Sequence, residues 1–136
     1  MPNRSTIRKA KEDLKEGKSP STAAGEFVHE EIEHVRHGKH GARSPQQAIA
    51  IGLNEARRAG VPLPPPRRGR TSTKTRESAE SAYKKGQRGA KKPSAKRSRA
   101  REKALKREPR NSASHRALSK QARAAWRRRR RGARRS

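Results

Sequence analysis

The chain has 136 residues, a formal net charge of +27 and no cysteine. Leu, Ile, Val and Phe together number 13, about 10% of the residues, and a share below roughly 20% in a highly charged chain is typical of disorder. The composition excludes a disulfide framework or a thiolate zinc site, and the absence of an apolar signal region or a long apolar run predicts a soluble intracellular protein.

Charge and apolar residues are distributed unevenly along the chain. Residues 1–66 carry a net charge of +3 and 11 of the 13 large apolar residues, whereas residues 67–136 carry +24 and only Leu105 and Leu118. Ordering each residue costs roughly 1–2 kcal/mol of backbone entropy, which buried apolar area must offset. The first half is therefore expected to fold, and the second half is not.

Three helices are predicted in the first half, over residues 6–16, 20–37 and 45–59. Ser19-Pro20 and Ser44-Pro45 each place a capping side chain before a proline at the first helical position. Gly60 suits the left-handed position that ends the third helix, with Val61 packing back on Ala56. The predicted fold class is mainly α, with a small three-helix unit over residues 1–61.

One apolar face of this unit is a candidate interaction surface, made by Phe27, Ile32, Ile49 and Leu53. Ile51 lies well off the line of Ile49 and Leu53 on the third helix. Three short helices bury little area, so this face could equally pack within the chain or form a dimer or protein contact.

Residues 62–136 are predicted to form a spacer followed by a tail. Pro62 to Pro66 favour an extended polyproline conformation within a spacer over residues 62–70. Residues 71–136 are predicted to be a largely disordered basic tail, with nascent helices near 94–107 and 112–131 that would form on an anionic partner.

Arginine is the strongest chemical signal in the second half. Guanidinium groups stay charged at physiological pH and bind phosphate oxygens bidentately. The predicted nucleic-acid-binding residues are Arg67, Arg68, Arg70, Arg97, Arg99, Arg101, Arg123, Arg127, Arg128, Arg129, Arg130, Arg131, Arg134 and Arg135. A solvated charge run or a localisation signal is the alternative interpretation.

Two shorter features accompany these arginines. Residues 66–70 resemble the core of the AT-hook, a minor-groove motif, although Thr71 stands where that motif usually has proline. Trp126 precedes the longest arginine run and could stack on a base, but we favour a role in covering the apolar side of a marginal helix. The chain has only three aromatic residues, which argues against a stacking platform of the RNA-recognition type.

Histidines cluster near the second helix, at His29, His34, His37 and His40. His29 and His34 are five residues apart, whereas the metalloprotease helix needs a spacing of four to place two imidazoles on one metal ion. We therefore interpret the histidines as solvated polar residues, with metal binding as the lesser alternative. No nucleophile, phosphate-binding glycine loop or catalytic carboxylate pair is recognised, so we expect neither a cofactor nor an enzyme.

The helical half also resembles a known family. The segments GEFV (25–28), EEIEHV (30–35), GKHG (38–41), QAIAIGL (47–53) and ARRAG (56–60) are similar to a bacterial, proteobacterial family of small basic proteins built on a domain of unknown function. The resemblance covers roughly residues 5–66, and Ala104–Glu108 and Ser114–Ser119 are similar to basic repeats in its longer relatives. It implies no activity, although some members are labelled DNA-binding.

Together these observations predict a non-enzymatic nucleic-acid-binding protein. The expected partner is DNA more than RNA, bound with little sequence preference, and the expected location is the cytoplasm in association with the nucleoid. The alternative is a protein-interaction or dimerisation module that uses the 44–60 helix, with the basic tail serving for localisation. A cationic membrane-surface peptide over Leu118–Arg131 ranks last, because its alanine-rich apolar face is thin.

Overall fold

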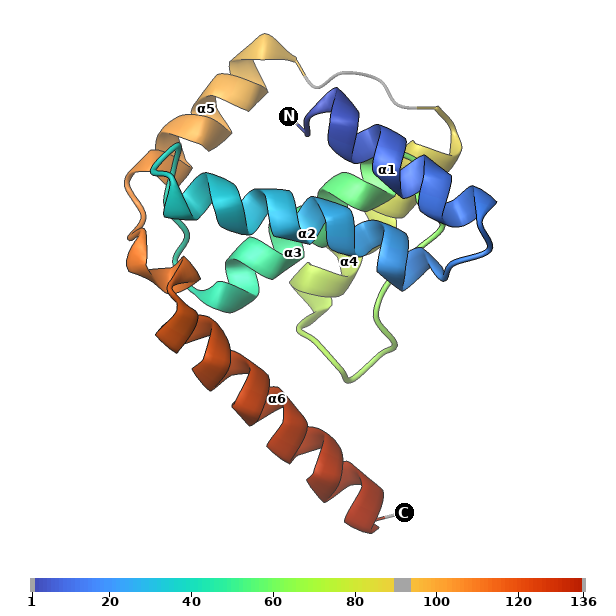
Figure 1. The fold of residues 1–136 in the computed structure, drawn as a ribbon, viewed down its shortest axis with the longest axis vertical. Helices are drawn as coiled ribbons and strands as arrows, with labels where there is room; N and C mark the ends of the chain where they lie inside the picture. The colour runs from blue at the N-terminus through green and yellow to red at the C-terminus, as the bar shows by residue number, and fades with distance from the viewer. Residues whose placement is uncertain (1, 90–93, 136) are drawn as a thin grey trace.

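The computed structural model describes residues 2–89 and 94–135, with side chains described as far as Gly132. Most of this part is helical, which confirms the mainly α class (Figure 1). The elements in chain order are α1 (Arg4–Lys15), α2 (Pro20–Arg36), α3 (Pro45–Arg58), α4 (Thr73–Gln87), α5 (Ala95–Lys106), the short 3₁₀ helix η1 (Asn111–Ala113) and α6 (His115–Arg135). The first three helices agree with the predicted ranges to within two residues at each end.

The local signals that predicted α2 and α3 are confirmed. The Ser19 hydroxyl accepts from the Thr22 N–H at 3.3 Å, and the Ser44 hydroxyl accepts from the Gln47 N–H at 3.2 Å. At the end of α3, Gly60 has a φ of 100° and the Val61 N–H donates to the Ala56 carbonyl at 3.1 Å. This pattern is a Schellman cap, in which the left-handed glycine turns the chain back over the last turn.

The prediction of a long disordered basic tail is wrong. The second half of the described chain forms helices α4, α5 and α6, and α4 packs directly against α3. Ala79 and Ala82 on α4 are 2% and 1% exposed, although neither counts as a large apolar residue. Small side chains bury backbone as well as side-chain surface, so a count of Leu, Ile, Val and Phe underestimated the packing available to this half.

Gly86 shows how closely α4 approaches α3. A Cβ atom at this position would overlap the Arg57 carbonyl oxygen, so only glycine permits the observed contact. The proline segment between the two helices does not hold α4 away, because the buried Arg57 guanidinium folds it back. Its Nε donates to the Leu63 carbonyl at 3.2 Å and its Nη2 donates to the Pro64 carbonyl at 3.1 Å.

A second attachment joins the loop after α2 to the segment between α5 and α6. The Gly41 N–H donates to the Leu105 carbonyl and the Ala42 N–H donates to the Pro109 carbonyl, both at 2.8 Å. The Ser112 hydroxyl donates to the Ala42 carbonyl, also at 2.8 Å. These bonds fix the chain at the point where α6 begins.

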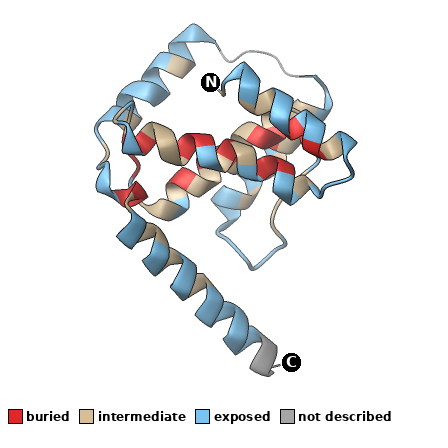
Figure 2. Ribbon diagram, viewed as in Figure 1, coloured by how far each residue is buried: buried red, intermediate tan, exposed pale blue. Residues whose placement is uncertain are grey.

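Helix α2 is the centre of the bundle and lies between α1 and α3 (Figure 1). Its buried side chains take part in two apolar clusters. Phe27 is fully buried with alanines of α1, α2 and α3, and Val35 is fully buried with alanines of the 42–48 region and η1. Figure 2 shows that the buried residues lie in this bundle, whereas α6 projects from it with its outer surface exposed.

Among the described residues, none of the helices is both long enough and apolar enough to cross a membrane.

Candidate nucleic-acid interface

Helix α6 carries the largest uncompensated charge in the chain. No acidic residue follows Glu108, whereas 11 lysines and arginines do. The Ser114 hydroxyl caps the helix by accepting from the Ala117 N–H at 3.1 Å. Within the described part of the chain, no side chain of α6 forms an ion pair with a carboxylate. Its cations are therefore available to an external anion.

Helical spacing places six of these cations along one line, which we call the α6 stripe. The stripe consists of Arg116, Lys120, Arg123, Arg127, Arg130 and Arg131, all of which are exposed. Steps of three and four residues keep side chains on one helix face, and 15 residues at about 1.5 Å each give a stripe roughly 22 Å long. The half-buried residues of this helix are Ala117, Leu118, Gln121, Ala124 and Ala125.

Trp126 lies beside the stripe and remains 52% exposed. The Arg130 guanidinium carbon lies 4.8 Å from the centroid of the indole ring, which is a cation–π contact. The structure therefore gives Trp126 a role in positioning one stripe arginine.

The other predicted arginines of the second half are also on the surface. Arg67, Arg68 and Arg70 are exposed on a turn between α3 and α4, in which the Arg70 N–H donates to the Arg67 carbonyl at 3.2 Å. This segment, which resembles an AT-hook core, is a turn in the free protein. The side chains of Arg134 and Arg135 lie outside the described residues.

Helix α5 presents Arg97, Arg99 and Arg101, all exposed. Arg101 has a second electrostatic role, because it acts on acidic groups of the bundle. Burial raises the pKa of Glu31, and the positive charge of Arg101 opposes that rise. This relationship could not be predicted from the sequence, since the two residues are 70 positions apart.

The predicted interaction face is largely used inside the chain. Phe27 is fully buried and Leu53 packs against its cluster, while Ile32 packs against the Val35 cluster. Ile49 is half-buried, and Ile51, which the pattern placed off the apolar line, is only 9% exposed. Both results follow from the position of α3, which packs against α2 and also against α4.

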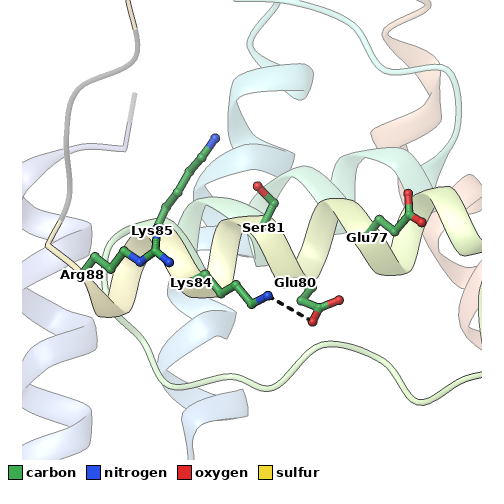
Figure 3. A pocket seen from close by; sticks show the side chains of 6 residues that line it. All are labelled: Glu77, Glu80, Ser81, Lys84, Lys85 and Arg88. Carbon is green, nitrogen blue, oxygen red and sulfur yellow. Dashed lines mark ion pairs between the residues drawn. The ribbon is translucent and has the colours of Figure 1, made fainter.

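A surface hollow on α4 does not add to the cationic interface (Figure 3). It is lined by Glu77, Glu80, Ser81, Lys84, Lys85 and Arg88. Lys84 Nζ lies 3.5 Å from Glu80 Oε1, so part of its positive charge is already paired. The hollow combines both signs of charge on an exposed helix face, and we assign it no ligand.

Two of the histidines, which were predicted to be solvated, are largely buried. The side chains of His34 and His40 are only 16% and 12% exposed, and both face the buried Glu31. His37, in contrast, is 73% exposed, as a solvated histidine should be. Sequence spacing did not predict this cluster, because His40 lies in the loop after α2. The left-handed turn at Gly38 brings that loop back toward the helix.

No curated protein and no solved structure shows significant similarity to the chain. The N-terminal part does match a family, and the matched residues 4–68 contain α1, α2, α3 and the proline segment. The similarity to a domain of unknown function that the sequence suggested is thereby confirmed for this part: residues 4–68 match the Family of unknown function (DUF6496).

Proposed function

We propose that this protein is a non-enzymatic nucleic-acid-binding protein that binds DNA phosphates through α6 with little sequence preference. Arg67, Arg68 and Arg70 and the exposed arginines of α5 extend the contact beyond the α6 stripe. The expected location is the nucleoid. The resemblance to a bacterial family with some members labelled DNA-binding agrees with this proposal.

The observation that carries the proposal is the uncompensated charge of the α6 stripe. Six exposed cations lie along one helix face, and no carboxylate of the described residues pairs with them. Binding to DNA releases condensed counterions for each phosphate that is neutralised, so a dense line of cations gains affinity without reading any base.

The helical form of α6 favours duplex DNA over duplex RNA. An α-helix with its side chains is about 10–12 Å across, which fits the major groove of B-DNA at about 12 Å. The major groove of A-form RNA is deep and narrow and does not admit a helix. Because α6 is already helical, binding would not require the folding of a disordered segment.

A salt titration of binding to duplex DNA tests the proposal. If about eight cationic side chains engage phosphates, log K should fall against log salt with a slope near −7. A slope shallower than about −2 would contradict phosphate binding as the dominant interaction. Parallel titrations with duplex RNA and with anionic lipid vesicles separate the alternatives, and tighter binding to either partner would overturn the assignment to DNA.

A further inference from the structure

The most unusual side-chain cluster outside α6 lies at the end of α2. It contains Glu31 and His34 from that helix and His40 from the loop that follows. One potential ligand atom from each residue lies within 4.8 Å of the others. Glu31 is 2% exposed, so its carboxylate is among the most deeply buried charges of the described chain.

His40 presents a nitrogen lone pair to this carboxylate. Its Nδ1 lies 2.8 Å from the Gly41 carbonyl oxygen, which can only accept, so Nδ1 carries the proton. In the neutral imidazole Nε2 is then an acceptor, and it lies 2.8 Å from Glu31 Oε1. That oxygen has no hydrogen-bond donor. Two acceptors at this separation require a positive species between them.

The two ring nitrogens of His34 also face carboxylate oxygens, one of Glu30 and one of Glu31. Its Nε2 lies 3.5 Å from Oε1 of Glu30, a carboxylate oxygen already fixed by the Asn3 N–H at 2.8 Å. Its Nδ1 faces Glu31 Oε2 at 3.8 Å. The two imidazoles meet edge to face, with centroids 6.1 Å apart. Each ring thus turns one nitrogen toward Glu31 and the other toward an oxygen acceptor.

This arrangement has the features of a metal-binding site. Histidines that bind metals usually donate the far ring N–H to a carbonyl or a carboxylate, which fixes the tautomer and aims the other nitrogen at the ion. Here the Gly41 carbonyl oxygen accepts from His40 Nδ1, whereas His34 Nε2 lies 3.5 Å from Glu30 Oε1 without a hydrogen bond. Two imidazoles and one carboxylate form a donor set that suits Zn²⁺ and related divalent transition metals.

We propose that Glu31, His34 and His40 bind one divalent transition metal ion of the zinc class. The ligand atoms are one carboxylate oxygen of Glu31, Nδ1 of His34 and Nε2 of His40, with solvent completing the coordination.

The site has a structural consequence for the rest of the chain. His40 is next to Gly41 and Ala42, whose N–H groups bond to the segment between α5 and α6. An ion that joins α2 to His40 would therefore strengthen the attachment from which α6 projects. Metal binding itself does not depend on nucleic acid, so its test is independent of the proposed function.

Isothermal titration of the full chain with ZnCl₂, after removal of metals with a chelator, tests the site. We expect one ion per chain, and a rise in the thermal unfolding temperature that EDTA reverses. The variants His34→Gln and His40→Gln should each lower the affinity by at least about tenfold, as expected for the loss of a ligand. The matched controls His29→Gln and His37→Gln change exposed histidines of the same region and should bind zinc like the native protein.

A measurement on the native chain keeps the proposal testable if a variant fails to fold. Substoichiometric Co²⁺ should broaden the ring resonances of His34 and His40 in the NMR spectrum before those of His29 and His37. No binding, equal broadening of all four histidines, or equal loss of affinity in the control variants would overturn the proposal. Glu31 and His40 would then share a proton only.

Discussion

Helices α4 and α6 both come from the basic second half, yet one is part of the bundle and the other leaves it. Helix α4 has Ala79, Ala82 and Gly86 at steps of three and four residues. The helix face that carries these small residues packs against α3. Helix α6 has alanines as well, but it meets the bundle only near η1 and α3 and exposes its basic face. A basic helix can therefore pack without large apolar residues when its small residues face a surface of matching shape.

The packed helices and α6 also differ in the burial of their charged residues. The packed region holds buried charged residues, namely Asp13, Glu30, Glu31 and Arg57. Helix α6 holds only exposed charges, all of one sign in its described part. Changes in the packed region should alter stability, and changes in α6 should alter binding.

The largest effect on stability is expected from Gly86→Ala. The added Cβ would overlap the Arg57 carbonyl oxygen, a backbone atom that can move only with α3. Overpacking of this kind typically costs 1–3 kcal/mol, and we expect about 3 kcal/mol in urea unfolding. The matched control is Gly132→Ala in α6, where an added Cβ has no neighbour within 4 Å. Equal effects of the two substitutions would show that α4 is not held by close packing.

A pH-dependent loss of stability is expected from Glu55 in the packed region. Burial, and then the negative charge of Glu31, raise the pKa of Glu55 from 4.5 to about 7. The folded state binds this proton more tightly than the unfolded state does. The contribution of Glu55 to the free energy of unfolding is therefore fully present below about pH 4.5. It is lost as the pH rises through 7, and the loss is at most about 3 kcal/mol.

The variant Glu55→Gln separates this effect from other titrations. The amide cannot lose a proton, so urea unfolding in the presence of a chelator should show a smaller decline between pH 5 and 8. At pH 8 the variant should be more stable than the native protein. If both proteins decline equally, Glu55 is not the group responsible.

The smallest effect is expected from Trp126→Ala in α6. The contact with Arg130 is exposed, and such cation–π contacts contribute about 0.5–1 kcal/mol. DNA affinity, measured by fluorescence anisotropy, should fall less than about fivefold. Stacking of the indole on a base would contribute about 1–3 kcal/mol, so a loss of tenfold or more would assign Trp126 to the nucleic-acid contact.

Local signals in the sequence predicted the first three helices well, because caps and apolar periodicity act over a few residues. Ser44-Pro45 and Gly60-Val61 fixed both ends of α3 without any tertiary information. The packing of α4 could not be read in this way. It depends on a glycine on one helix meeting a backbone carbonyl on another, and neither residue carries an apolar signal.

Of the two candidate sites, one could be predicted from the sequence and the other could not. The arginines of the α6 stripe were predicted from composition, since charge density needs no tertiary partner to be recognised. The Glu31, His34 and His40 cluster was missed, because helical spacing addressed only residues on one helix. The turn at Gly38 brings the loop back to α2, and that return is a tertiary event.

We propose that the α6 stripe, and not net charge alone, binds nucleic acid. The most direct test compares two variants that each replace six cations by glutamine. The first changes the stripe, and the second changes Arg4, Arg8, Lys9, Lys11, Lys15 and Lys74, which are exposed and lie outside α6. The slope of log K against log salt for duplex DNA should become shallower by about 5 in the stripe variant and by less than about 1 in the control. Equal changes in both variants would show that the bulk charge of the chain, and not the α6 stripe, determines binding.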